Sequence, residues 1–171
     1  MHYGDILRLI TWMKQPKRIV EFGILEGFSL RAFVEGASTS CEITAYDIFE
    51  QFNGNAAKRC IQDSFPESNV SIQEGDFYKQ HEYFEDNSID ILHIDIANDG
   101  ATYKFAIEHY MKKMSKGGLM IFEGGSKERD AIGWMVKYNK APIHDFLHSV
   151  SEQYRYTVLE PFPSMTILQK T

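Results

Sequence analysis

Arg18-Ile-Val-Glu-Phe-Gly-Ile-Leu-Glu-Gly-Phe-Ser29 is a short apolar run that ends on an acid and continues into a glycine-containing turn. The pattern predicts a buried strand, a nucleotide-binding type of turn and the start of a helix. Gly23 and Gly27 permit a positive φ or a close backbone approach, and Ser29 is the expected helix cap. A carboxylate at the end of a buried strand needs hydrogen-bond donors, so we expect Glu21 to face a ligand.

Strand and helix patterns alternate along the chain on both sides of this stretch. Such alternation is typical of a parallel sheet with right-handed crossovers. The expected strands after the opening run are Cys41–Asp47, Asn69–Gly75, Ile89–Asp95 and Leu119–Glu123, the last preceded by a turn at 116–118. The expected helices are Tyr3–Lys14 as an entry helix within residues 1–15, Phe28–Gly36, Asn53–Phe65, Ala101–Met114 and Ser126–Tyr138.

The end of the chain follows a different pattern. Tyr154–Leu159 and Ser164–Leu168 both suit strands, and only four residues, 160–163, separate them. A parallel crossover needs a dozen or more residues, so the two strands are expected to form an antiparallel hairpin within residues 154–169.

Length and composition limit the class of protein. With 171 residues, of which 43% are apolar, the chain suits one domain, residues 1–171. It contains no apolar run of bilayer length and no signal-peptide pattern at its start, so we expect a cytoplasmic protein without a membrane partner. The spacing of Cys41 and Cys60 indicates free thiols. A net charge of −6 argues against nucleic-acid binding and favours a small-molecule substrate.

Four of the predicted strands end on an acid, at Glu21, Asp47, Asp95 and Glu123. The carboxyl ends of parallel strands meet at one rim of the sheet, where open α/β sheets bind their ligands. Asp47 follows Gly27 by 20 residues, a spacing at which a carboxylate can accept both hydroxyls of a ribose. The four acids therefore predict a binding site on this rim.

The motif from Glu21 to Ser29 resembles the first motif of class I S-adenosylmethionine-dependent methyltransferases, although Leu25 replaces the commonest middle glycine. Gly75-Asp76-Phe77 is similar to the adenine-edge motif of that family, and its other interpretation is a turn that Asp76 caps. The resemblance implies a Rossmann-like three-layer α/β sandwich with a seven-stranded, mostly parallel sheet and an antiparallel hairpin. It implies S-adenosylmethionine as cofactor, bound by Glu21, Phe22, Gly23, Gly27, Ser29, Asp47, Ile48, Gly75, Asp76, Phe77 and Asp95.

Small-molecule O-methyltransferases of the catechol and macrolide-sugar type resemble this chain in a further respect. Their acids after the fourth and fifth strands bind a divalent metal, which holds the acceptor hydroxyl and lowers its pKa. Asp95 and Glu123 match two of these positions, but Gly124 stands at the third. Two alternatives stay open: a Mg²⁺ ion held by Asp95 and Glu123, completed by Asn98 or Asp99, or no metal at all.

Residues that act on the acceptor are harder to identify. Asp95 and His144 are the candidate catalytic residues, His144 as a general base because histidine accepts a proton near neutral pH. His93 suits a hydrogen-bonded core position. Arg129 suits either a carboxylate or phosphate of the substrate or a surface charge cluster. Further candidates for contacting the acceptor are His148, Tyr103 and Lys104.

The sequence thus predicts transfer of a methyl group from S-adenosylmethionine to a small molecule, at oxygen. One alternative is a protein that binds the cofactor without transferase activity. Another is a nucleotide- or nucleotide-sugar-binding enzyme, against which stands the absence of the spacing G-x-G-x-x-G. The chain has almost no inserted segment for the acceptor, so the candidate sources of that site are the entry helix, the loops after the fourth and fifth strands, residues 139–150 and the second subunit of a homodimer.

Overall fold

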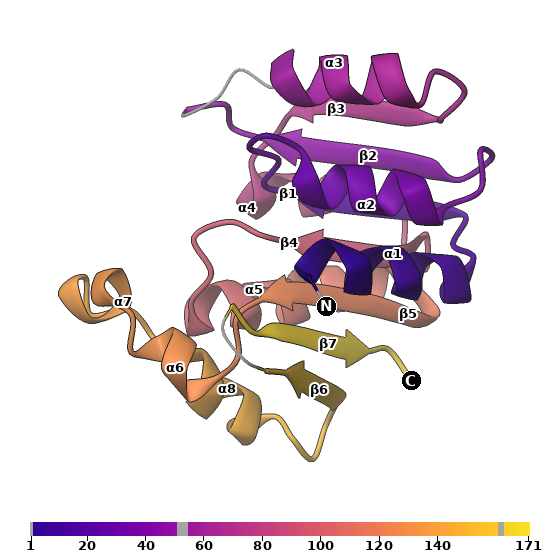
Figure 1. Ribbon diagram of the computed structural model, residues 1–171. Helices are drawn as coiled ribbons and strands as arrows, with labels where there is room; N and C mark the ends of the chain where they lie inside the picture. Colours follow the sequence, from indigo (N-terminus) through magenta and orange to yellow (C-terminus); the bar gives the residue numbers. More distant parts are fainter. Residues whose placement is uncertain (1, 51–54, 161–162) are drawn as a thin grey trace.

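The computed structural model describes residues 2–50, 55–160 and 163–171 of the chain. These residues build one seven-stranded sheet with the order β3-β2-β1-β4-β5-β7-β6 (Figure 1). The strands are β1 (Arg18–Phe22), β2 (Glu42–Asp47), β3 (Val70–Glu74), β4 (Ile89–Ile94), β5 (Met114–Glu123), β6 (Arg155–Leu159) and β7 (Met165–Gln169). The helices are α1 (Tyr3–Lys14), α2 (Phe28–Gly36), α3 (Asn55–Ser64), α4 (Phe77–Gln80), α5 (Gly100–Tyr110), α6 (Lys127–Asp130), α7 (Gly133–Lys137) and α8 (Ile143–Ser149), with short 3₁₀ turns η1 (His81–Tyr83) and η2 (Met111–Lys113).

The pairing of the strands confirms the predicted α/β fold. β1 pairs in parallel with β2 and β4, β2 with β3, and β4 with β5. β7 runs antiparallel to both β5 and β6, as the short connection between the last two strands requires. Because the five parallel strands share one direction, their carboxyl ends meet at one edge of the sheet.

Helices cover both faces of the sheet, as Figure 1 shows. Side chains from α1, α2 and α3 pack with alternate strand residues such as Ile19 and Ile91 in one core. Side chains from α4, α5 and α8 pack with the intervening residues, such as Val20 and Leu92, in the other. Successive strand residues point to opposite faces, which is why the buried strands are apolar at nearly every position.

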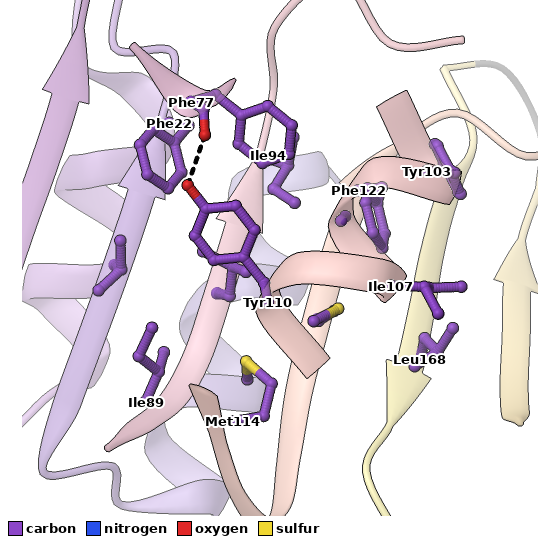
Figure 2. Close-up of a cluster of buried hydrophobic side chains, with 14 of the residues drawn as sticks. Phe22, Phe77, Ile89, Ile94, Tyr103, Ile107, Tyr110, Met114, Phe122 and Leu168 are labelled. Carbon is purple, nitrogen blue, oxygen red and sulfur yellow. Dashed lines mark hydrogen bonds between the residues drawn. The ribbon is translucent and has the colours of Figure 1, made fainter. Parts of the chain in front are cut away.

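Aromatic rings organise the second core near the carboxyl rim (Figure 2). The rings of Phe77 and Tyr110 stack with their centroids 5.1 Å apart, and Phe22 meets both edge-on. The hydroxyl of Tyr110 donates to the backbone carbonyl of Phe77 at 2.6 Å, the dashed line in Figure 2. These contacts fix the start of α4 against the sheet, and with it the loop that follows β3.

Most element boundaries differ from the sequence prediction by a residue or two, and the two largest differences concern β5 and residues 126–138. The predicted helix Ala101–Met114 ends as α5 at Tyr110, followed by η2.

β5 begins at Met114, because Met114 already pairs with Ile89 before a register shift restores regular pairing at Leu119. The predicted turn at 116–118 is therefore an irregularity inside the strand, where Gly117 has φ +70°.

The predicted helix at 126–138 is two short helices, α6 and α7, because Ile132 adopts an extended conformation and Gly133 restarts the helix. Ser126 caps α6 as expected, since its hydroxyl accepts from the backbone N–H of Arg129. In Figure 1, α7 projects from the body of the protein beyond the carboxyl rim.

Two helices were not predicted. α4 is a single turn after β3, and α8, within residues 139–150, packs against α5. The predicted start of the third helix at Asn53 lies outside the described residues, and α3 is described from Asn55. None of the helices in the described ranges is long and apolar enough to cross a bilayer.

The two cysteines should differ in reactivity. Cys41 is 1% exposed, and burial raises the pKa of its thiol to about 11, whereas Cys60 on α3 is partly exposed. Because the thiolate is the nucleophile, we expect iodoacetamide at pH ~8 to alkylate Cys60 and to spare Cys41 in the folded protein. Peptide mass spectrometry measures both sites, with the denatured protein as the fully reactive control. Equal alkylation of both cysteines in the folded protein would contradict the packing around Cys41.

Candidate active site

A cavity of about 560 Å³ opens at the carboxyl ends of the parallel strands, within the size range of small-molecule sites. Each of the five parallel strands, or the loop that follows it, contributes to its wall. The lining residues are Phe22, Gly23, Leu25, Tyr46, Asp47, Ile48, Glu50, Gly75, Asp76, Phe77, Tyr78, Asp95, Ile96, Ala97, Arg129 and Trp134.

The turn after β1 requires its two glycines. Gly23 has φ +91°, and a Cβ there would collide with the backbone carbonyl of Asp95. Gly27 has φ +86°, and its Cβ would lie 2.9 Å from the side chain of Ala57. Gly23 lines the cavity, whereas Gly27 does not, so Gly27 serves the close approach of α2 and α3. Leu25, which replaces the usual glycine, adopts φ +44° and faces the cavity.

Asp47 stands at the end of β2 and lines the cavity, as predicted for a ribose-binding acid. Its Oδ2 accepts from the backbone N–H of Ile24 at 2.8 Å, and its Oδ1 accepts from that of Phe49 at 2.9 Å. These bonds fix the carboxylate between the loops after β1 and β2. Oδ2 also accepts, at 3.5 Å, from the backbone N–H of Leu25, so Oδ1 retains the larger accepting capacity for a ligand hydroxyl. Ile48 is half exposed and lines the same cavity.

Gly75, Asp76 and Phe77 form one corner of the cavity. Asp76 caps α4, because its Oδ1 accepts from the backbone N–H of Tyr78 at 2.9 Å. The alternative interpretation of Asp76 as a turn cap is therefore correct, and it is compatible with a ligand contact since the same carboxylate also faces the cavity. Phe77 is 3% exposed and closes the inner wall.

Glu21 does not face the cavity, which corrects the sequence prediction. Its side chain is fully buried on the α1 and α2 side of the sheet, where Oε1 accepts from the hydroxyl of Ser29 at 2.5 Å and lies 2.9 Å from Nδ1 of His93. Ser29 consequently does not cap α2, whose N-cap is Gly27, and it does not line the cavity either. His93 is a hydrogen-bonded core residue, as expected, and Tyr3 of α1 contacts its Nε2 at 3.0 Å.

Asp95 follows β4 and lines the centre of the rim. Its carboxylate has no hydrogen-bond partner among the described residues. Burial raises the pKa of this carboxyl above its ordinary value, and the nearby carboxylate of Glu123 adds to the rise. Asp95 is thus a partly desolvated acid with free accepting capacity, directly beside the turn after β1.

Glu123 is held by an arginine, and this arrangement does not fit a divalent cation. Nε of Arg129 donates to both carboxylate oxygens at 2.8 and 3.0 Å, and Nη2 donates to Oε2 at 2.9 Å. Nδ2 of Asn98 donates to two backbone carbonyls, while its Oδ1 is buried without a partner among the described residues. Asp99 caps α5 and pairs with Lys140. In the described part of the chain, no three His, Cys, Asp or Glu side chains gather in a group that could hold a metal ion. The predicted Mg²⁺ site at Asp95 and Glu123 therefore lacks a free second carboxylate.

The other acceptor candidates lie away from the cavity. His144, predicted as a general base, is in the first turn of α8 and does not line the cavity, because α8 packs on α5. His148 and Lys104 are exposed and also outside it. Tyr103 is fully buried in the core, where its ring stacks on Phe122.

Three aromatic residues that line the cavity, Tyr46, Tyr78 and Trp134, were not predicted as site residues. Tyr46 lies in β2 and Tyr78 in α4. Trp134 is the second residue of α7, and its ring centroid lies 5.2 Å from the guanidinium carbon of Arg129. The break between α6 and α7, which turns this ring toward the cavity, has no clear signal in the sequence.

Solved structures share this fold over nearly the whole chain. A methyltransferase from Geobacter sulfurreducens is 22% identical, with a TM-score of 0.74, over 98% of this chain and 77% of that one. An O-methyltransferase from Bacillus cereus in complex with SAH is 18% identical, with a TM-score of 0.76, over 98% and 80% of the chains. The O-methyltransferase TomG from Streptomyces achromogenes in complex with SAM is 13% identical, with a TM-score of 0.72, over 98% and 79%.

Sequence comparison identifies the family. No curated protein matches the chain. The profile of the family described as "Methyltransferase domain" matches residues 20–123, which is more than half of the 171 residues and includes β1 to β5 with the acids that follow them. The chain belongs to this methyltransferase-domain family and is a class I S-adenosylmethionine-dependent methyltransferase.

Proposed function

We propose that the chain acts as one domain that methylates a hydroxyl group of a small molecule in the cytosol, without help from a metal ion. The observation that carries the proposal is the cavity at the carboxyl rim, where Asp47, Asp76 and Asp95 line one continuous wall. Two of the structural neighbours are O-methyltransferases in complex with SAH or SAM, which supports oxygen as the methylated atom.

The residues present fit S-adenosylmethionine. Asp47, fixed by two backbone N–H groups, suits the ribose hydroxyls, and Asp76 with Phe77 suits the edge and face of the adenine. Gly23 lets the turn after β1 pack against the backbone of Asp95, because a Cβ at this position would collide with the Asp95 carbonyl, and both residues then border the space for the methionine end. When bound, S-adenosylmethionine supplies an activated sulfonium methyl group.

The protein then has to align the acceptor, exclude water and remove one proton. Asp95 suits the last task, because its carboxylate lies in the cavity without a partner and burial raises its pKa toward that of a useful base. Of the two predicted catalytic residues, Asp95 and His144, only Asp95 lines the cavity, so we propose Asp95 alone as the base.

Transfer of a labelled methyl group tests the proposal. The protein is incubated with methyl-labelled S-adenosylmethionine and a panel of catechols and phenols, with EDTA in one series and Mg²⁺ in the other. We expect label on an acceptor oxygen at equal rates in both series, because Glu123 is already bound by Arg129. Transfer that stops in EDTA would contradict the metal-free part. S-adenosylhomocysteine binding with no transfer to any acceptor would instead favour a binding protein without transferase activity.

A further inference from the structure

Arg129 is a buried cation, and one nitrogen of its guanidinium group makes no hydrogen bond to the described residues. It is 4% exposed, and Nε and Nη2 donate to Glu123. Nη1 is closed to solvent and has no hydrogen-bond partner among the described residues. An unpartnered buried donor on a charged group is costly, so this nitrogen is suited to a ligand that supplies an oxygen.

Arg129 lies at the β5 end of the cavity, on the side away from β3 and β2. The sheet order β3-β2-β1-β4-β5 sets the cavity wall in the sequence Asp76, Asp47, Gly23, Asp95 and Arg129. If the nucleoside lies over β3 and β2 and the methionine end over β1 and β4, the end beside β5 is left for the acceptor. This assignment rests on the proposed function.

Arg129 and Asp95 border the same space. Burial raises the pKa of the Asp95 carboxyl, and the charge of Arg129 acts on it in the opposite direction with a smaller effect. Among the described residues that line the cavity, Arg129 is the only cation, while Asp47, Glu50, Asp76 and Asp95 are acids. For an oxygen that becomes negative there, Arg129 is the only cationic side chain among the described lining residues.

We propose that Nη1 of Arg129 donates a hydrogen bond to the acceptor's hydroxyl oxygen, so that the guanidinium stabilises the oxyanion as a divalent cation would. The hydroxyl proton passes to Asp95. The acceptor oxygen forms the new bond to the methyl carbon as the methyl–sulfur bond breaks, and the electron pair of that bond stays on sulfur. Glu123 fixes the guanidinium plane through three hydrogen bonds and leaves Nη1 for the acceptor.

An acceptor that binds Nη1 of Arg129 must displace neighbouring side chains, since this nitrogen is closed to solvent in the free protein. Trp134 lies against the guanidinium and also lines the cavity. Acceptor binding should therefore change the fluorescence of Trp134. Trp12 on α1 is 64% exposed and outside the cavity, so Trp12→Phe leaves Trp134 as the single reporter.

The decisive test uses 4-nitrocatechol, whose ionised form has a distinct visible absorbance, bound to the protein together with S-adenosylhomocysteine and EDTA, so that no methyl transfer occurs. A cation close to the phenol lowers its pKa by about one to three units, and we expect a fall of this size in the wild-type complex. Arg129→Gln should abolish the fall. Lys127→Gln, an exposed charge on the same helix and outside the cavity, should preserve it.

Glu123→Gln separates an electrostatic role from a structural one. In Glu123→Gln the carboxylate that compensates Arg129 is gone, so Arg129 should lower the pKa of bound 4-nitrocatechol further. If the ion pair were merely structural, the pKa of the bound probe would rise in Glu123→Gln as well as in Arg129→Gln. The proposal is overturned if the wild-type protein does not bind the probe at millimolar concentration, if binding leaves the probe's pKa unchanged, or if Arg129→Gln retains the shift.

Separate binding measurements distinguish this inference from the proposed function. If S-adenosylhomocysteine does not bind, the proposed function fails. If it binds and transfer occurs but the probe's pKa is unchanged, only the role of Arg129 fails. If Arg129→Gln weakens S-adenosylhomocysteine but not 5′-methylthioadenosine, which lacks the amino acid part, Arg129 binds the cofactor's carboxylate and the acceptor assignment is wrong.

Discussion

Replacing His93 with leucine is expected to lower the free energy of unfolding by about 3–5 kcal/mol, because the change leaves Glu21 as a buried charge without its main partner. Glu21 and His93 are both fully buried on neighbouring strands, and Oε2 of Glu21 has no hydrogen-bond partner in the part of the chain that the structure describes. Burial raises the pKa of Tyr3 well above its ordinary value, so its hydroxyl stays protonated and can donate to Nε2 of His93. Nδ1 then carries the proton that Glu21 accepts.

Urea denaturation of the wild type and the variant measures this difference. The matched control is the double variant Glu21→Leu with His93→Leu, which removes both polar groups and should be more stable than His93→Leu alone. Tyr3→Phe, which removes one hydrogen bond and keeps the ring, should cost about 1 kcal/mol. A His93→Leu protein within about 1 kcal/mol of wild type would show that the buried network contributes little.

Replacing Asp47 with alanine is expected to weaken S-adenosylhomocysteine binding by about 100-fold or more, because two charge-assisted hydrogen bonds to the ribose are each worth about 1.5–3 kcal/mol. The change also frees the backbone N–H groups of Ile24 and Phe49, which loosens both loops that border the site. Titration calorimetry measures the affinity.

Glu74→Ala provides the control for Asp47→Ala. Glu74 ends β3 opposite Asp47 in the sheet, and its side chain is exposed and outside the cavity. Its loss should leave the affinity within about twofold of wild type, because an exposed charge outside the site contributes little. Equal losses in the two variants would indicate a general charge effect and not a ribose contact.

The fold could be predicted almost completely from local patterns. Alternating strands and helices specify a parallel sheet, and the short 160–163 connection specifies the hairpin. The two largest boundary differences have long-range causes. Met114 joins β5 because it pairs with Ile89, and the 126–138 helix is broken where α6 and α7 take up different positions on the rim.

The site could be predicted only in part, and Glu21 shows why. Glu21 lies at the end of its strand, as predicted, but its side chain faces the protein core and not the cavity. Its partner, His93, lies 72 residues away and meets it only through the β1–β4 register. Asp47 and Gly75–Phe77 were easier to predict, because their motifs are short and the cavity lies directly at the strand ends. The pairing of Glu123 with Arg129 depends on the turn between β5 and α6, which the sequence pattern does not specify.

The most direct test of the account is calorimetric titration of the unaltered protein with S-adenosylhomocysteine in the presence of EDTA. The cavity between Asp76 and Asp95 predicts saturable binding of one molecule per chain, unchanged when Mg²⁺ replaces EDTA. No binding under either condition would contradict the assignment of this cavity to the cofactor. Binding that appears only with Mg²⁺ would contradict the metal-free site formed by Glu123 and Arg129.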